Sequence, residues 1–241
     1  MLGDYIDLHL HLLPGLDDGP AELEESVAIA RGLAGLGFRR LVATPHRAAG
    51  KFEASDEEAE AALAALHAAL ADDADRQALG LAREYFFDRL LLEDLMEGRL
   101  RLLSESTRAF LFEFPMDAVP SEAREVIFRA RSKGYRPVLA HPERNLVLGG
   151  KLDLLRSMVD DGVALLVNLG SLAKLYGRRE RRAGRKILDA GLATALASDC
   201  HAAMGGLAAT ADGIEEVERR WGSEAVRQLL CEGPRRLLGE D

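Results

Sequence analysis

The stretch YIDLHLHLLPGLDDG, residues 5–19, defines the first unit of the fold. Its alternating pattern predicts a strand over Tyr5–His11, and the Pro-Gly and Asp-Asp-Gly runs predict a loop after it. Residues two apart on a strand share a face, so His9 and His11 should point the same way. The pattern fits a strand that directs two imidazoles at one ligand. It also fits an ordinary amphipathic strand with these residues on its core side: Ile6, Leu8, Leu10 and Leu12.

Beyond this stretch, short apolar runs alternate with helical patterns along the chain. The predicted strands are Tyr5–His11, Arg39–Thr44, Leu79–Glu84, Ala109–Phe114, Arg136–Ala140, Ala164–Asn168 and Thr194–Ala197. The predicted helices are Ala21–Leu36, one from the Ser55 capping box to about Ala71, Ser121–Lys133, Lys151–Asp161, Arg178–Ala190 and Gly206–Trp221. Helix stops are predicted at Gly134, Gly162 and Gly191. This alternation predicts an α/β fold, a parallel barrel or a doubly wound sheet, in one domain over residues 1–241.

Composition narrows the class of protein. The chain has 241 residues, 48% of them hydrophobic, and a net charge of −9, which argues against a nucleic-acid partner. Cys200 and Cys231 lie far apart, so no disulfide framework is expected and a reducing compartment is favoured. Asp4 and Asp7 interrupt any signal-like segment, and no apolar run is long enough for a membrane span. We therefore expect a cytoplasmic protein without membrane insertion.

The histidines collect at one predicted edge of the fold. Only His67 falls inside a predicted helix, whereas the other histidines lie at or just after the carboxyl ends of predicted strands: His9, His11, His46, His141 and His201. Barrel and open α/β enzymes place their chemistry at this edge. The distribution therefore predicts a functional site there.

Four acidic residues fall at the same edge: Asp18, Glu84, Glu113 and Asp199. Each alone is compatible with an exposed loop carboxylate. Together with the histidines they form a set of nine nitrogen and oxygen ligands without a thiolate, which suits Zn²⁺, Mn²⁺ or Fe and exceeds the needs of one ion. Clustered ions of this kind commonly catalyse phosphoester hydrolysis.

The order of short motifs is more specific than any of them alone. They are His9-x-His11, Asp17-Asp18-Gly19, Thr44-Pro45-His46, Glu84, Glu113-Phe114-Pro115, His141-Pro142-Glu143-Arg144 and Ser198-Asp199-x-His201. This set resembles the PHP (polymerase and histidinol phosphatase) superfamily. The forms LPGLDDG, ATPH, HPER and SDxH are most similar to its capsular-polysaccharide tyrosine-phosphatase branch, the CpsB type. The resemblance covers about residues 5–201 and, more weakly, the closing GPRRLL.

The resemblance implies a distorted (β/α)7 TIM-like barrel of the PHP type with three divalent metal ions, Mn, Fe or Zn, at the carboxyl ends of the strands. One ion would be held by His9, His11, Glu84 and Asp199. A second would be held by Glu84 as a bridge, Glu113 and His141. The third would be held by Asp18, His46 and His201.

By the same resemblance, a metal-bridging hydroxide would attack phosphorus in line, without a phosphoenzyme. The substrate would be a phosphotyrosine-containing protein, such as the tail of a bacterial tyrosine kinase that controls exopolysaccharide or capsule biosynthesis. A guanidinium should orient the phosphate, with Arg144 as first candidate and Arg47 as second. Arg144 can instead form a surface ion pair with Glu143 or another neighbour.

The substrate side departs from the family pattern. That branch usually has asparagine just after SDxH and an arginine a few residues later, but here no arginine follows His201 until Arg219. A second histidine or asparagine commonly follows TPH, where this chain has Arg47. Arg47, or the cluster Arg178, Arg179, Arg181 and Arg182, can replace the missing cation. Such a cluster is also typical of a solvated helix face.

Three functions other than a metal-dependent tyrosine phosphatase are compatible with parts of the sequence. A thiolate mechanism at Cys200 lacks the C-x₅-R loop, so this cysteine is predicted to fill space below the site. Histidinol phosphatase shares the metals but needs a tighter pocket and an acid for the substrate amine. A non-catalytic, metal-stabilised regulatory module is the third. The sequence leaves open the metal identity, the native substrate and the oligomeric state.

Overall fold

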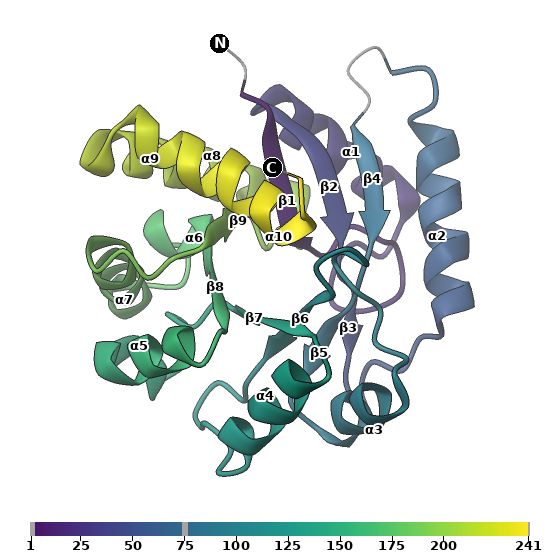
Figure 1. Ribbon diagram of the computed structural model, residues 1–241. Coiled ribbons are helices and arrows are strands. Elements are labelled where there is room, and N and C mark those ends of the chain that lie inside the picture. The colour runs from purple at the N-terminus through teal and green to yellow at the C-terminus, as the bar shows by residue number, and fades with distance from the viewer. Residues whose placement is uncertain (1–2, 74–76, 241) are drawn as a thin grey trace.

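The computed structural model describes residues 3–73 and 77–240, and its strands form two parallel sheets (Figure 1). The three-stranded sheet has the order β1 (Tyr5–Leu10), β2 (Phe38–Ala43), β4 (Ala78–Leu81). The six-stranded sheet has the order β3 (His46–Arg47), β5 (Glu84–Phe86), β6 (Ala109–Glu113), β7 (Arg136–Ala140), β8 (Ala164–Asn168), β9 (Ala195–Ala197). Every pairing is parallel, and the ladders do not join the two sheets.

Helices surround the strands in Figure 1, and the C-terminal helix α10 lies across their centre. The helical segments are α1 (Leu23–Gly35), α2 (Asp56–Ala69), α3 (Arg89–Glu97), α4 (Ala123–Ser132), η1 (Leu148–Gly150), α5 (Leu152–Asp160), α6 (Leu169–Leu172), α7 (Arg178–Asp189), α8 (Ala203–Trp221), α9 (Ser223–Arg227), η2 (Gln228–Glu232) and α10 (Gly233–Leu238). The predicted α/β class with parallel strands is confirmed. Within the described ranges, no helix is long and apolar enough to cross a bilayer.

Several local predictions agree with the structure. Ser55 and Glu58 form the reciprocal capping box at the start of α2. Gly134, Gly162 and Gly191 follow helices with φ of 81°, 89° and 66°, the left-handed conformation that ends a helix cheaply. The helix predicted from Gly206 is the regular part of α8, whose first turn is non-helical before that residue.

One predicted strand, Leu79–Glu84, is wrong as a single unit. The chain leaves the first sheet after β4 and enters the second at β5, and Arg83 lies between them with its side chain buried. Its guanidinium donates hydrogen bonds to the carboxylate of Asp56 and to the carbonyls of Ala54 and Ser55, at 2.7–3.0 Å. These bonds pair Nε and Nη2 of a buried cation, and the ladder is interrupted where they form.

A register shift in β1 decides which side chains face the centre. Ile6 and Leu8 belong to a central apolar cluster that includes residues of both sheets, whereas Leu10 and Leu12 pack in the outer cluster with the helices. The pairing with β2 is irregular between Asp7 and Leu10, as a bulge produces. The alternative in which all four aliphatic residues share one face is therefore wrong.

Helix α10 closes the opposite end of the central cluster. Leu237 and Leu238 pack into it and are buried. The segment before β6 holds the helix: Thr107 Oγ1 donates to the Leu237 carbonyl at 2.5 Å, and Ser104 Oγ donates to the Leu238 carbonyl at 2.8 Å. The amino ends of the strands are thus covered, and the carboxyl ends remain for a site.

Candidate metal centre

All nine predicted ligand residues meet at the carboxyl ends of the strands. Glu84 is at their centre and is fully buried. Its Oε2 lies 3.2 Å from His9 Nε2, 3.2 Å from His11 Nε2 and 3.1 Å from His46 Nδ1. Its Oε1 lies 3.0 Å from His141 Nε2. Glu84, the first residue of β5, therefore joins histidines on or just after three other strands, β1, β3 and β7.

Two further carboxylates, those of Asp199 and Glu113, extend this cluster. Asp199 Oδ1 lies 3.4 Å from His9 Nε2 and 3.5 Å from His11 Nε2. Glu113 Oε1 lies 3.4 Å from His46 Nδ1. Two ligands of a tetrahedral ion, each about 2.1 Å from it, are separated by about 3.4 Å. The spacing therefore fits metal ligands.

Asp18 forms the outer part of the cluster with two histidines. Its Oδ1 lies 3.5 Å from His46 Nε2 and 3.4 Å from His201 Nε2. The side chain of Asp18 is about half exposed, whereas His9 and His11 are fully buried. The cluster thus runs from a buried centre to an open edge that a substrate can reach.

Several buried atoms here lack a hydrogen-bond partner among the described residues: His9 Nε2, His11 Nε2, His46 Nδ1 and Glu84 Oε2. A buried polar atom without a partner costs about 1–3 kcal/mol, so four in one place need an explanation. A cation that accepts their lone pairs supplies one. The residues present therefore fit a metal centre.

The donor atoms fall into overlapping groups that could each hold an ion. These groups are His11, Asp18, His46 and His201; His9, His11 and Glu84; and His46, Glu84 and Glu113. The groups share His11, His46 and Glu84. The geometry alone therefore does not assign each ligand to one ion. The three-ion division remains a prediction.

The density of carboxylates also favours bound cations. Burial, together with the charges of Glu84 and Asp199, raises the pKa of Glu113 to about 9. Burial alone would raise the pKa of Glu84 as well, but His9 and His46 outweigh it and hold that pKa well below its usual range. Without a cation, three carboxylates this close cannot all be ionised cheaply.

Asp17 was part of the sequence motif but had no predicted role. Its Oδ2 lies 2.6 Å from His11 Nδ1 and accepts the backbone N–H of His46 at 2.9 Å, while its Oδ1 accepts that of Gly19. A carboxylate on the second ring nitrogen fixes the tautomer of a metal-binding histidine. Asp17 therefore holds Nε2 of His11 free for the cluster.

Arg144 is the cation that contacts the cluster. It donates a 2.8 Å hydrogen bond to Asp199 Oδ2 and lies over the ring of Tyr176, 4.1 Å from its centroid. Asn168 Nδ2 and the Tyr176 hydroxyl donate to the same oxygen at 2.5 and 3.3 Å. Neither Asn168 nor Tyr176 was among the site residues predicted from the sequence. Asn168 was detectable as a polar residue that ends an apolar strand, but Tyr176 gave no signal.

The remaining candidate cations lie elsewhere. Arg47, next to His46, is paired with Asp94 on α3 at 3.5 Å. Arg178, Arg181 and Arg182 line a hollow beside α7. In the part of the chain that the structure describes, Arg178, Arg181 and Arg182 form no hydrogen bond or ion pair with the nine ligands.

Backbone strain accompanies two of the candidate ligands. His141 and Asp199 have φ of 31° and 51°, a region that residues with a side chain rarely adopt. His141 comes directly after β7, and Asp199 lies two residues after the end of β9. Strain of this kind persists where the surroundings hold it, and it is frequent at functional sites.

Cys200 does not contribute a nucleophile. It is buried, its Sγ donates to the Ala202 carbonyl at 3.3 Å, and burial raises the pKa of its thiol to about 12. The thiolate that a cysteine-dependent phosphatase needs is therefore disfavoured. The predicted space-filling role agrees with this environment.

Comparison with known proteins identifies the family. The family described as capsular polysaccharide synthesis, CpsB/CapC, matches residues 5–239. The chain belongs to the CpsB/CapC family. The resemblance predicted from the ordered motifs is confirmed, and it extends past the last of them to the C-terminal helices.

Relatives in this family cover nearly the whole chain. The tyrosine-protein phosphatase YwqE of Bacillus subtilis (strain 168) is 31% identical over 233 residues, which cover 97% of this chain and 91% of YwqE. The tyrosine-protein phosphatase CpsB of Streptococcus pneumoniae is 25% identical over 238 residues, 97% of this chain and 98% of CpsB. A crystal structure from a study of these two proteins, described as unique metal-dependent tyrosine phosphatases, superimposes with a TM-score of 0.88 at 31% identity, covering 98% of this chain and 95% of that one.

Proposed function

We propose that this CpsB/CapC protein is a metal-dependent protein-tyrosine phosphatase. The observation that carries the proposal is a buried cluster of imidazole and carboxylate groups, open to solvent on the Asp18 side. Several of its polar atoms have no hydrogen-bond partner among residues 3–73 and 77–240. The activity named for YwqE and CpsB supports the choice of reaction.

The proposed ligands divide among three divalent ions, Mn, Fe or Zn. His9, His11, Glu84 and Asp199 would hold the first. Glu84, Glu113 and His141 would hold the second, and Asp18, His46 and His201 the third. Bound ions supply Lewis acidity that neutralises phosphoryl oxygens and lowers the pKa of water.

The chain's own residues bind and orient the phosphate. Arg144 is partly exposed and already aligned by Asp199 and Tyr176, so its free N–H groups can donate to a phosphoryl oxygen. Asp17 keeps His11 in one tautomer, and Asn168 holds Asp199 in place. These contacts fix the site before substrate arrives, which lowers the cost of reorganisation.

Exposed apolar side chains favour a tyrosyl substrate over histidinol phosphate. Among the described residues, most large exposed hydrophobic side chains lie in segments that follow β6, β7, β8 and β9: Met116, Leu146, Leu175 and Met204. Met116 and Leu146 are joined by a 2.7 Å backbone hydrogen bond. An apolar rim suits a phenyl ring, whereas histidinol phosphate carries a cationic amine.

The proposal also includes the closed barrel, the kinase substrate and the cytoplasmic location that the sequence predicts. The two sheets would form a distorted (β/α)7 barrel in a single domain, and backbone hydrogen bonds between β1 and the segment after β9 support it: His11 N donates to Cys200 O, and Asp199 N to His9 O, at 3.0 Å. The substrate would be a tyrosine kinase of capsule synthesis. The free, buried cysteines support action in the cytoplasm.

The test compares phosphate release from a phosphotyrosyl peptide and from histidinol phosphate by Mn²⁺-loaded protein. We expect preference for the peptide and loss of activity in His9→Ala. Preference for histidinol phosphate would identify the protein as a histidinol phosphatase and reject the tyrosine-phosphatase proposal. If neither substrate nor any other phosphomonoester is hydrolysed, the non-catalytic module becomes the better explanation.

A further inference from the structure

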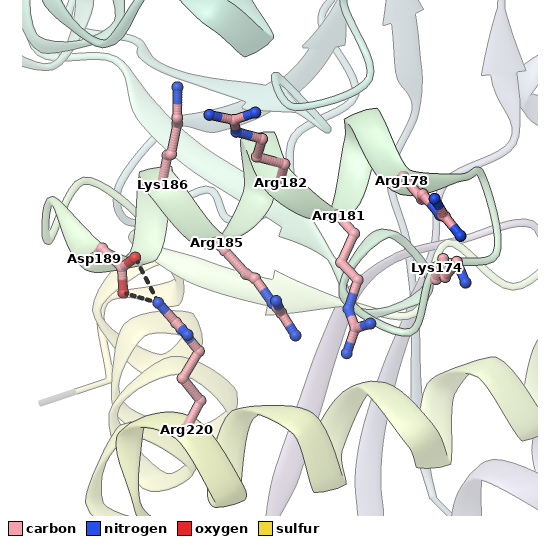
Figure 2. A pocket seen from close by; sticks show the side chains of 8 residues that line it. All are labelled: Lys174, Arg178, Arg181, Arg182, Arg185, Lys186, Asp189 and Arg220. Carbon is pink, nitrogen blue, oxygen red and sulfur yellow. Dashed lines mark hydrogen bonds and ion pairs between the residues drawn. The ribbon is translucent and has the colours of Figure 1, made fainter.

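A strongly cationic hollow lies beside α7, outside the metal centre. It has a volume of about 460 Å³, and all but one of the side chains that line it are lysines or arginines (Figure 2). The exception, Asp189, pairs with Arg220 of α8 at 3.0 Å, across the gap between the two helices. This concentration of positive charge stands out in a chain whose net charge is −9.

Most of the charge in this hollow is available to a ligand. Among the described residues no ion pair is formed by four of the lining side chains, all exposed: Lys174, Arg178, Arg182 and Lys186. Arg181 and Arg185 share one carboxylate, that of Glu216. The Nε atoms of both arginines are buried without a hydrogen-bond partner in this part of the structure.

The arrangement works against the stability of α7 itself. Arg178 and Arg182, and Arg182 and Lys186, are like charges four residues apart, which repel on a helix surface. Arg178, Arg181 and Arg182 also lie in the first turns, where the helix dipole favours negative charge. If this face of α7 served only to contact water, a mixture of acidic and basic residues would make the helix more stable. The cost is consistent with a surface that binds an anion.

The chain segment that includes Lys174 and Arg178, at one end of the hollow, passes beside the metal centre. Tyr176 lies two residues before α7, and its hydroxyl is 3.3 Å from Asp199 Oδ2. Arg179, in the first turn of α7, donates to the carbonyl of Arg144 at 3.2 Å. From there α7 runs away from the carboxyl edge for 12 residues. This length is about 18 Å, which an extended peptide of about five or six residues would cover.

We propose that this hollow binds an acidic segment of the phosphoprotein substrate, next to the phosphotyrosine that enters the metal centre. The inference rests on the proposed function, and it names the class of substrate: polypeptides with a run of Asp or Glu beside the target tyrosine. A concave surface at peptide scale favours a polypeptide, and Lys174 and Arg178 at one end of it lie two residues from Tyr176, which contacts Asp199. An anionic membrane would bind a flatter, partly apolar face, and none of the lining side chains is hydrophobic.

The first experiment measures binding without catalysis. A fluorescein-labelled decapeptide of Glu and Gly, lacking tyrosine, is titrated with the metal-loaded protein and with the charge-reversal variant Arg182→Glu/Lys186→Glu. The matched control is Lys151→Glu/Arg156→Glu, which makes the same change of charge at two exposed positions. Lys151 directly precedes α5, and Arg156 lies within it. We expect the variant to bind at least about tenfold more weakly and the control to keep most of the affinity.

The second experiment measures its consequence for turnover. Two phosphotyrosyl peptides are compared, one with flanking Glu residues and one with Gln in their place. We expect Arg182→Glu/Lys186→Glu to raise KM about tenfold for the Glu peptide only, with kcat and hydrolysis of para-nitrophenyl phosphate unchanged.

The outcomes separate the two proposals. Equal affinity of wild type and variant for the acidic decapeptide would overturn the docking surface, as would equal KM values for the Glu and Gln peptides. Charge-dependent binding to phosphatidylglycerol vesicles without binding to the decapeptide would overturn it in favour of a membrane. Charge-dependent peptide binding by a protein that hydrolyses no phosphotyrosine would preserve the surface and reject the proposed reaction.

Discussion

The two ends of the central space differ in almost every physical respect, although the same strands build both. At the amino end, aliphatic side chains such as Leu8 and Leu111 pack with Leu237 of α10, and all are fully buried. At the carboxyl end lie buried histidines and acids, two strained residues, and polar atoms that have no hydrogen-bond partner within the described chain. The amino end is built for stability, and the carboxyl end keeps unsatisfied groups ready for ligands.

The comparison teaches where each kind of mutation should act. Loss of a group at the carboxyl end should reduce activity with little damage to the fold, because the group is not satisfied by the protein alone. Loss at the amino end should do the reverse. Four predictions test this division, from the largest expected effect to the smallest.

Substitution of a central ligand should nearly abolish activity. His9→Ala is expected to lower kcat/KM at least about a thousandfold, since an ion that loses a ligand is held weakly and misplaced. Far-UV circular dichroism should stay as in the wild type, and the increase in Tm on adding Mn²⁺ should shrink. The control is His67→Ala on the exposed face of α2. Near-normal rates for His9→Ala would remove this residue from the proposed centre.

At the amino end, Leu237→Ala should lower the free energy of unfolding by about 2–4 kcal/mol, because it leaves a cavity in the central cluster. Urea titration measures the loss, and kcat of the folded variant should be unchanged. Met96→Ala, at a half-exposed position on α3, should change stability by less than about 0.5 kcal/mol. A fall in kcat for Leu237→Ala would show that the two ends are coupled.

Arg144 tests the border between the buried centre and the open edge. Arg144→Ala should reduce kcat/KM about a hundredfold through loss of a charge-assisted contact to phosphate. Arg144→Lys should restore only part of this, because an ammonium does not reproduce the planar pair of donors. Arg156→Ala on α5 serves as the surface control. Full activity in both Arg144 variants would assign phosphate binding to another cation.

Glu143 should make stability depend on pH. Burial raises the pKa of this carboxyl to about 7 in the folded state, although Ser171 and Asn168 donate hydrogen bonds to it. The folded protein therefore holds the proton more tightly than the unfolded chain, and this contribution to stability is lost as the pH rises through about 4.5 to 7.

Glu143→Gln keeps the acceptor oxygen and removes the titration. Relative to this variant, the metal-free wild type should lose about 1.5 kcal/mol of stability between pH 5.5 and pH 7, measured by urea unfolding. A constant difference across that range would show that the carboxyl does not titrate there.

Local patterns predicted much of the fold and the whole cluster of candidate ligands. Strands β7 and β8 agree residue for residue with the prediction, because strong apolar runs bounded by polar residues leave little choice. The nine ligands could be gathered because topology brings the carboxyl ends of parallel strands together. What failed depended on tertiary contacts. The break between β4 and β5 requires a buried Arg83 whose partners are about 30 residues away, and the bulge in β1 depends on pairing with β2.

The supports of the site were equally hidden. Tyr176 reaches Asp199 only because the segment between α6 and α7 passes the carboxyl edge, and no periodicity marks it. Division of the lone pairs among ions depends on angles between side chains from several strands. Sequence spacing carries no such information.

The position of α10 has a consequence for the order of folding. Its two leucines complete the apolar cluster that contains Ile6 and Leu8 of β1, so the earliest strand obtains its full set of partners only from the latest helix. Contacts between such distant positions are slow to form, because closing a long loop costs entropy before any packing is gained. During synthesis on the ribosome, β1 must therefore wait with part of its apolar face exposed, and this interval is when the nascent chain would most benefit from a chaperone.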